Sequence, residues 1–398
     1  MTASESFPTS APTLPTELWS LIFALSVPPP SFDEPATERQ LALSRCARVC
    51  RAWRPIAERM LYAYPTLATA QQAEGFRRSL ATEGGRMRRV KTLRVGRMWS
   101  VMDRDPQGVE FALSQMVAAC GEGVEEVVVG KVEGVVVDEQ LAGAQNLRDL
   151  HLCDSSLQYL SSAESSTAAS KIPIISLFSL YNITHLTLSD IDPPSHFGGL
   201  WDFLKSFPNL TALAAIHSRR PYYYIPPTIR YLHALPLPTQ LFGVEGADPQ
   251  ITEGELALGA VTKGQLNCGS PILGFSCTAE ELRRRDGLKR LPPSLRFLRL
   301  TSGHFFGRDF LTPFLSSSSA RNHLIKLEEL VLPMRVSTGA AYEDLRAWAR
   351  GNGVRVVWER DEEGMGTMWE GGFWECVRRW EGVVAREKET LRREEDGV

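Results

Sequence analysis

One short pattern recurs along most of this 398-residue chain and restricts its fold more than any other feature. An aliphatic residue is followed by two variable positions, a second aliphatic residue, one variable position and a third aliphatic residue. The starts of successive copies are mostly about 20 to 35 residues apart, which is typical of stacked structural repeats. Eight copies are recognisable, and they start at Val90, Val124, Leu147, Ile183, Leu210, Ile229, Leu295 and Leu327.

Each copy predicts a short strand whose fourth and sixth residues point to one face while the third and fifth point to the other. A single strand of this kind cannot bury its apolar face, but neighbouring copies laid side by side make a continuous core. The pattern therefore predicts a curved α/β solenoid. We expect an irregular copy near Pro271–Cys277 and a last strand at Val354–Glu359. We also expect a closing helix that caps the solenoid end with Phe373, Val377, Trp380 and Val384.

The array resembles a degenerate leucine-rich repeat domain. It departs from that family where the consensus places Asn or Cys after the strand, because Ser155 and Ile191 stand there in the third and fourth copies. The resemblance implies a leucine-rich-repeat-like solenoid with irregular repeats over residues 66–360. Residues 361–398 would form the C-terminal cap helix and tail.

The segment Leu14–Leu61 carries more apolar residues than a helix packed on one side requires. Pro15 suits the first position of a helix, and Glu17 lies where the helix dipole favours a carboxylate. Two apolar faces then follow within about ten residues. Leu18, Leu21, Ile22 and Leu25 form one face, and Trp19 and Phe23 form a second pair beside it.

A second helix is predicted after a proline-rich gap, with Leu43, Cys46, Val49, Cys50 and Trp53 along one face. Pro55 should end it and open a third helix that carries Ile56, Met60 and Leu61. Because so small a unit seldom buries all its apolar surface, the remaining residues predict a docking face for another protein. The alternative is a helical cap on the domain that follows.

The same segment resembles an F-box, with LPTELWSLIF at Leu14–Phe23 and VCRAW at Val49–Trp53. The resemblance implies that residues 13–65 bind the Skp-family adaptor of a cullin ubiquitin ligase, after a disordered tail at residues 1–12. The loop Val27–Arg39 is longer than the usual link between the first two helices. The implied adaptor contacts are Leu14, Pro15, Leu18, Ile22, Phe23, Leu43, Val49, Cys50 and Trp53.

Composition argues against several other classes of protein. The net charge is −3, and acidic residues flank the clearest basic run, Arg283–Arg285, so no nucleic acid partner is expected. The apolar run Ile172–Tyr181 is about half the length of a membrane span, and no membrane association is expected. The N-terminus lacks the features of a secretory signal. Seven scattered cysteines fit a reducing compartment, the cytoplasm, the nucleus or both.

A protein substrate is expected to contact the third and fifth strand positions and the loops beyond the strands, because mixed aromatic and charged groups suit protein recognition. Two loops stand out: residues 217–224 follow the fifth copy, and residues 304–308 follow the seventh. The alternative is that their aromatic residues pack beneath the loops. The candidate substrate contacts are His151, His185, Arg219, Arg220, Tyr222, Tyr223, Phe305 and Arg308.

Catalytic interpretations are weaker. His151, His185 and His233 are predicted to face outward, where a zinc site is conceivable, but surface histidine is the commoner explanation. Cys46 and Cys50 lie one helical turn apart and suit an apolar role. The sequence contains no P-loop and no GxSxG nucleophile motif. We therefore expect no enzyme activity, no metal and no cofactor.

These observations predict a substrate-recognition adaptor of an SCF-type cullin ubiquitin ligase. Its helical unit would hold the Skp-family adaptor, and its repeats would hold a protein substrate whose identity the sequence does not reveal. The alternative is a non-catalytic interaction scaffold that does not direct ubiquitination.

Overall fold

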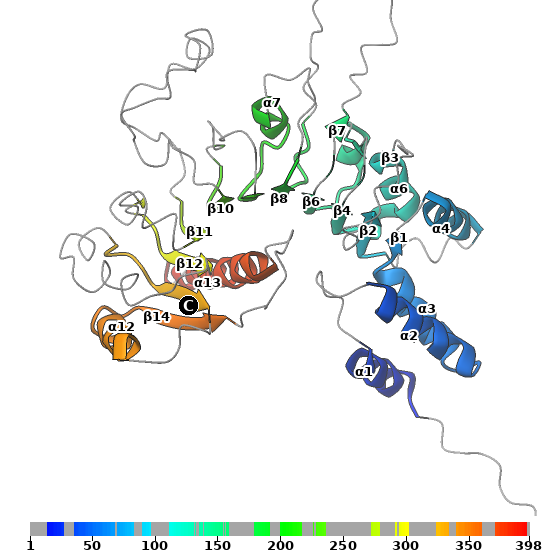
Figure 1. The fold of residues 1–398 in the computed structure, drawn as a ribbon, viewed down its shortest axis with the longest axis horizontal. Helices are drawn as coiled ribbons and strands as arrows, with labels where there is room; N and C mark the ends of the chain where they lie inside the picture. Colours follow the sequence, from blue (N-terminus) through cyan, green and yellow to red (C-terminus); the bar gives the residue numbers. More distant parts are fainter. Residues whose placement is uncertain are drawn as a thin grey trace, which may run out of the picture.

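A curved sheet of parallel strands dominates the chain (Figure 1). The computed structural model describes residues 14–27, 36–67, 70–82, 90–96, 111–130, 132, 135–137, 139–153, 155, 157–158, 179–191, 200–216, 226, 228–235, 272–278, 291–292, 294–301, 324–333, 340–359 and 371–395. Within them, 11 strands pair in the order β1-β2-β4-β6-β8-β9-β10-β11-β12-β13-β14. A second, three-stranded sheet contains β3 (Phe111–Ala112), β5 (Val135–Val136) and β7 (Leu157–Gln158).

The repeat pattern locates the strands of the large sheet accurately, because each of the eight copies begins its strand at its third residue. These strands are β2 (Thr92–Gly96), β4 (Glu126–Gly130), β6 (Asp149–Cys153), β8 (His185–Ser189), β9 (Ala212–Ile216), β10 (Tyr231–Leu235), β12 (Phe297–Thr301) and β13 (Glu329–Pro333). The expected irregular copy is β11 (Gly274–Thr278), and the expected last strand is β14 (Arg355–Glu359). A short strand, β1 (Thr66–Leu67), precedes them. The prediction of a sheet built from repeats is confirmed.

Equivalent positions of the repeats pair with one another, so each position forms a row across the sheet. Leu93 pairs with Val127, Val127 with Leu150, and Leu150 with Leu186. This row belongs to the main core, where residues at the first, fourth and sixth positions are almost fully buried. Neighbouring strands therefore share one continuous core, as the spacing of the pattern predicts.

Polar residues just before the pattern also join successive repeats. The side-chain amide of Asn146 donates a hydrogen bond to the carbonyl of Glu122, and that of Asn209 to the carbonyl of Tyr181. Asn182 donates to the carbonyl of Ala144, and Ser294 donates to that of Ile272. These bonds satisfy turn carbonyls that the strands leave unpaired.

Helices cover the outer, convex side of the sheet (Figure 1). They are α4 (Ala70–Thr82), α6 (Leu113–Cys120), α7 (Leu200–Lys205) and α12 (Ala340–Gly351), with 3-10 turns at Gly121–Gly123 and Glu139–Gly143. In α6, Leu113, Met116, Val117 and Cys120 recur at the spacing of one helix face and are buried against the strands. The main core therefore lies between the sheet and its outer helices.

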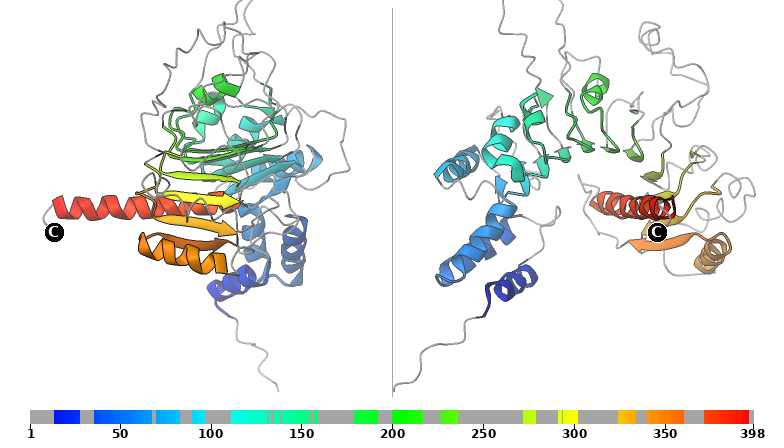
Figure 2. Two further views of the ribbon diagram at one scale, coloured as in Figure 1. Left: turned by 60° about the vertical axis from the view of Figure 1, so that its left-hand side comes forward. Right: turned by 180° about the vertical axis from the view of Figure 1, so that it is seen from behind.

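The long C-terminal helix α13 (Gly371–Glu395) lies on the opposite, concave side of the sheet (Figures 1 and 2). Its side chains Phe373, Trp374, Val377 and Trp380 are buried with Ala214, Tyr231, Phe297 and Val331 from the strands. This position differs from the predicted one at the solenoid end. The reason is that the concave rows offer aromatic and small residues that fit the aromatic face of the helix.

Three helices precede the sheet: α1 (Thr16–Ser26), α2 (Ala36–Val49) and α3 (Arg54–Ala63). Phe23, Ile56 and Ala57 are buried at their centre, and Trp19, Cys46 and Trp53 pack around them. We refer to residues 14–64, which hold these three helices, as the N-terminal helical unit. Within the described parts of the chain, no helix combines the length and the apolar character that a membrane span requires.

Candidate binding surfaces

Most of the large hydrophobic side chains that are exposed in the described parts of the chain belong to the N-terminal helical unit. Among the described residues, ten large hydrophobic side chains are exposed, and seven belong to this unit. We call these seven the N-terminal apolar surface: Leu14, Leu18, Leu21, Ile22, Leu25, Leu41 and Val49. The other three, Tyr181, Ile325 and Leu391, lie far apart in the chain. Leu18, Leu21, Ile22 and Leu25 share one face of α1, and an exposed apolar face of this kind is typical of a site that another molecule covers.

The predicted adaptor contacts differ in how far they are exposed. Leu14, Pro15, Leu18, Ile22, Val49 and Cys50 are exposed. Phe23 and Leu43 are 3% and 1% exposed, so they are part of the interior. Trp53 is half-buried, with ring centroids 4.9 Å from Trp19 and 5.2 Å from Phe23. The apolar pattern does not distinguish the side chains that support the bundle from those that remain free.

Exposed arginines accompany the apolar side chains on α2. Arg45 and Arg48 lie on the same helical stripe as Leu41 and Val49, at spacings of three, four and seven residues. Leu41 was not among the residues singled out from the sequence, since it precedes the predicted apolar face by two positions. Its exposure depends on how α2 is rotated against α3.

The second candidate surface is the concave face, formed by the third and fifth residues of each copy of the pattern, which are the first and third residues of each strand. These residues point away from the main core, as predicted, but α13 covers many of them. His151 is only 2% exposed, and the His185 side chain only 14%. The prediction that both histidine side chains are exposed to a partner is therefore wrong. Both rings contact Trp374 edge to face, at centroid distances of 5.3 and 5.5 Å.

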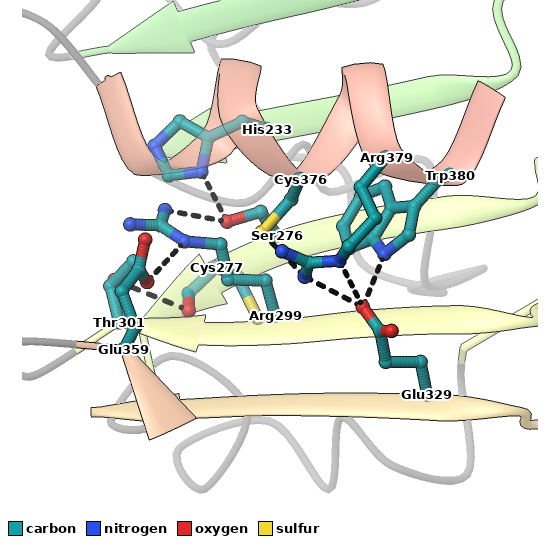
Figure 3. A network of polar contacts seen from close by, with 10 residues as sticks. All are labelled: His233, Ser276, Cys277, Arg299, Thr301, Glu329, Glu359, Cys376, Arg379 and Trp380. Carbon is teal, nitrogen blue, oxygen red and sulfur yellow. Dashed lines mark hydrogen bonds and ion pairs between the residues drawn. The ribbon is translucent and has the colours of Figure 1, made fainter. Parts of the chain in front are cut away.

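Hydrogen bonds from two indole rings position α13 on this face. The indole N–H of Trp374 donates to the hydroxyl of Thr187 at 3.0 Å, and that of Trp380 donates to Glu329 Oε1 at 2.8 Å. Arg379 donates to the same carboxylate oxygen at 2.7 Å (Figure 3). Glu329 is 4% exposed, so these charge-assisted bonds are made away from water.

A glycine on β11 makes room for the second indole. A Cβ atom at Gly274 would lie 2.8 Å from Trp380 Cε3 and 2.7 Å from Tyr231 Cδ1. Trp380 stacks almost parallel to Phe297, at 5.4 Å between centroids and 9° between planes. The sequence does not single out Gly274, because its importance comes from a residue about a hundred positions away.

A series of hydrogen-bonded polar side chains lies near the start of α13. His233 Nδ1 is 2.9 Å from Ser276 Oγ, and Arg299 donates to that oxygen at 3.3 Å (Figure 3). Arg299 also donates to Glu359 Oε2 at 2.8 Å. Gly372 passes so close that a Cβ there would collide with Glu359, which explains the glycine at this point of the helix.

His185 joins the sheet to α13 electrostatically. Its Nδ1 is 2.9 Å from Asp149 on the neighbouring strand, and its Nε2 is 3.3 Å from Glu381 on α13. Burial lowers the pKa of His185, but hydrogen bonds to Asp149 and Glu381 outweigh it and raise the pKa to about 9. The protonated ring therefore attracts the helix to the concave face.

The described residues contain no group of three or more His, Cys, Asp or Glu side chains placed to hold a metal. His151 interacts with Glu126 at 3.4 Å, whereas His185 pairs with Asp149 and Glu381, so the two histidines have separate partners. The remaining candidate substrate contacts, Arg219, Arg220, Tyr222, Tyr223, Phe305 and Arg308, lie outside the described residues.

Comparison with known proteins adds a weak likeness. No family model and no curated protein matches the chain. Among solved structures, the chain is similar to an internalin from Listeria monocytogenes str. 4b F2365, with 11% sequence identity. The match covers 75% of this chain and 91% of the internalin, at a TM-score of 0.24. A likeness this distant carries no argument, so the fold rests on the strands and their register.

Proposed function

We propose that the chain is a substrate-recognition adaptor of an SCF-type cullin ubiquitin ligase. The N-terminal helical unit would act as the F-box and bind the Skp-family adaptor, and the repeat domain would hold a protein substrate. One observation carries the proposal: the apolar residues of the LPTELWSLIF segment that the F-box resemblance assigns to the adaptor include exposed Leu14, Leu18 and Ile22. Their neighbour Phe23 is buried within the unit.

The energetics favour a protein partner for these side chains. Complete burial of a Leu, Ile or Val side chain contributes roughly 1.5–3 kcal/mol, and seven such side chains are exposed on one small unit. A stable interface buries on the order of 1,000 Å² or more, and a central apolar cluster supplies much of its free energy. The exposed arginines Arg45 and Arg48 would then lie close to the partner.

The chain would contribute proximity to the reaction. Holding a substrate on the same assembly as the activated ubiquitin raises the effective concentration of substrate lysines near the thioester. This role requires two binding surfaces and no residue with a tuned pKa. Ubiquitin transfer would take place on the other subunits of the ligase.

The test uses the full chain and a purified Skp-family adaptor. Replacing both Leu18→Ala and Ile22→Ala should weaken adaptor binding at least about tenfold, because two apolar anchors are lost. Ile325→Ala is the matched control, since Ile325 is 79% exposed outside the unit, and it should leave the affinity unchanged. Equal affinity of the double variant and the wild-type chain would refute the proposal.

Trp53→Ala is a poor substitute for that double variant. Trp53 packs against Trp19 and Phe23, so its removal should destabilise the unit, by less than the roughly 3–5 kcal/mol of a fully buried tryptophan because Trp53 is half-buried. A loss of binding would then report unfolding of the unit as well as the lost contact.

The scaffold alternative is favoured by one observation, because α13 fills part of the surface expected to bind the substrate. Reconstitution with the adaptor, the cullin and a ubiquitin-conjugating enzyme distinguishes the two functions. A substrate adaptor should promote ubiquitin transfer to a bound protein. A scaffold would form the same complex without that transfer.

A further inference from the structure

The two faces of the large sheet have different chemistry, although the same strands form both. On the core side, the residues at the fourth position of the copies are almost all aliphatic, as at Leu150, Leu186 and Leu298. On the concave side, Thr187, Tyr231 and Glu329 alternate with small and aromatic residues. Aromatic anchors among hydrogen-bonded polar groups are typical of protein interfaces, whereas uniform aliphatic packing is typical of a domain core.

Helix α13 contacts this face as a peptide ligand contacts a groove. Phe373, Val377 and Trp380 follow the i, i+4, i+7 spacing of a helix that presents one apolar face. The helix adds no strand to the sheet and is the last element of the described chain. Its C-terminal half extends past the edge of the sheet (Figure 2). The helix can therefore leave the concave face without breaking the hydrogen bonds between the strands.

The polar groups beneath α13 suit a surface that is sometimes open. Glu329 accepts bonds from Trp380 and Arg379, and Thr187 accepts one from Trp374. Water can replace these donors when the helix leaves. An aliphatic face would have no such replacement, and buried polar pairs add little stability relative to apolar packing.

We propose that the concave face is a receptor for an amphipathic helix, that α13 is its resident occupant, and that a helix of the protein substrate replaces α13. The incoming helix would carry two aromatic anchors spaced like Trp374 and Trp380, an arginine placed like Arg379, and a carboxylate placed like Glu381 to meet His185. The inference rests on the proposed function only where it calls this partner the substrate.

The first test measures binding of a fluorescent peptide with the sequence of residues 371–395 to the full chain. The wild-type chain should bind it weakly, because its own helix competes at high effective concentration. A full chain with Trp374→Ala and Trp380→Ala should bind the peptide at least about tenfold more tightly, since its own helix has lost both indole anchors.

Two controls show whether the peptide binds the concave face at the position of α13. Adding Gly274→Val to the double variant should abolish peptide binding, because the new side chain occupies the space of the second indole. A peptide with Trp380→Ala should also fail to bind. A host helix of alanine and lysine that carries only the anchor residues should bind, which tests the chemistry of the partner.

Hydrogen exchange of the unmodified chain gives a second test that needs no variant. If α13 leaves as a unit, its amides should exchange faster than those of β8, β9 and β12, because opening the groove leaves the sheet folded. The proposal is overturned if α13 and these strands exchange together. It is equally overturned if the double variant loses cooperative unfolding or remains folded without binding the peptide. Adaptor binding plays no part in these measurements, so they can fail independently of the proposed function.

Discussion

At the scale of single residues, the concave face contains partly buried carboxylates that are paired with histidines. Glu126 accepts a hydrogen bond from Thr92 at 2.8 Å and lies 3.4 Å from His151, while Asp149 pairs with His185. Burial raises the pKa of both acids, but the histidine partners outweigh it and lower the pKa of each below its ordinary value. These acids therefore stay ionised inside the protein.

His185 makes the stability of the protein depend on pH. Its pKa is about 9 in the folded chain, against 6.5 for a free histidine. Because folding raises the pKa, the stabilising contribution is fully present below pH 6.5 and is lost as the pH rises through 9. Wild type should be more stable than His185→Gln at pH 6, and this difference should shrink by roughly 2–3 kcal/mol by pH 10.

Denaturant unfolding of the two proteins at several pH values measures this difference. The sign is specific, because a histidine that is buried in its neutral form would gain stability as the pH rises. A difference that stays constant from pH 6 to pH 10 would show that His185 is not held as a cation.

At the scale of elements, the position of α13 requires open space on β11. Gly274→Ala should destabilise the chain by about 1–3 kcal/mol, because the added methyl group overlaps both Tyr231 and Trp380. Gly382→Ala on α13 is the matched control, since nothing lies within 4 Å of its Cβ position. That change should stabilise the helix by about 0.5–1 kcal/mol. Thermal unfolding measures both variants, and a neutral Gly274→Ala would contradict the tight packing.

The strands themselves follow from local sequence. The first, fourth and sixth positions of each copy are apolar, and a register shift by one residue would turn all of them toward the other face. The pattern therefore specifies each strand and its inward face without knowledge of distant residues. Asn146, Asn182 and Asn209 precede three of the copies and bond to the preceding repeat, and they are a signal that the sequence analysis did not use.

At the scale of the whole molecule, the N-terminal helical unit has a core of its own. Its buried residues are separate from those of the sheet, and Tyr62 is the residue of the unit that packs on the main core, stacked on Phe76. The side chain of Gln40 also bonds to the carbonyl of Thr66. Because these contacts are few, we expect the N-terminal helical unit and the sheet to unfold separately.

Removal of residues 1–64 should accordingly leave the sheet folded. The loss of Tyr62 and of the bond from Gln40 should cost about 1–3 kcal/mol, and unfolding should remain cooperative. Circular dichroism during thermal unfolding measures both quantities. A truncated chain without a cooperative transition would show that the helical unit is part of the same core.

The order of residues alone dictates the repeats, their strands and the apolar character of the N-terminal helices, because these depend on spacings of a few positions. Long-range packing settles which apolar side chains become interior, as for Phe23 and Leu43, and which stay exposed, as for Leu18 and Ile22. It also settles the burial of His151 and His185, because their cover comes from Trp374, about two hundred residues away. No local sequence pattern predicts a contact across that distance, because the contact depends on the shape of the assembled sheet.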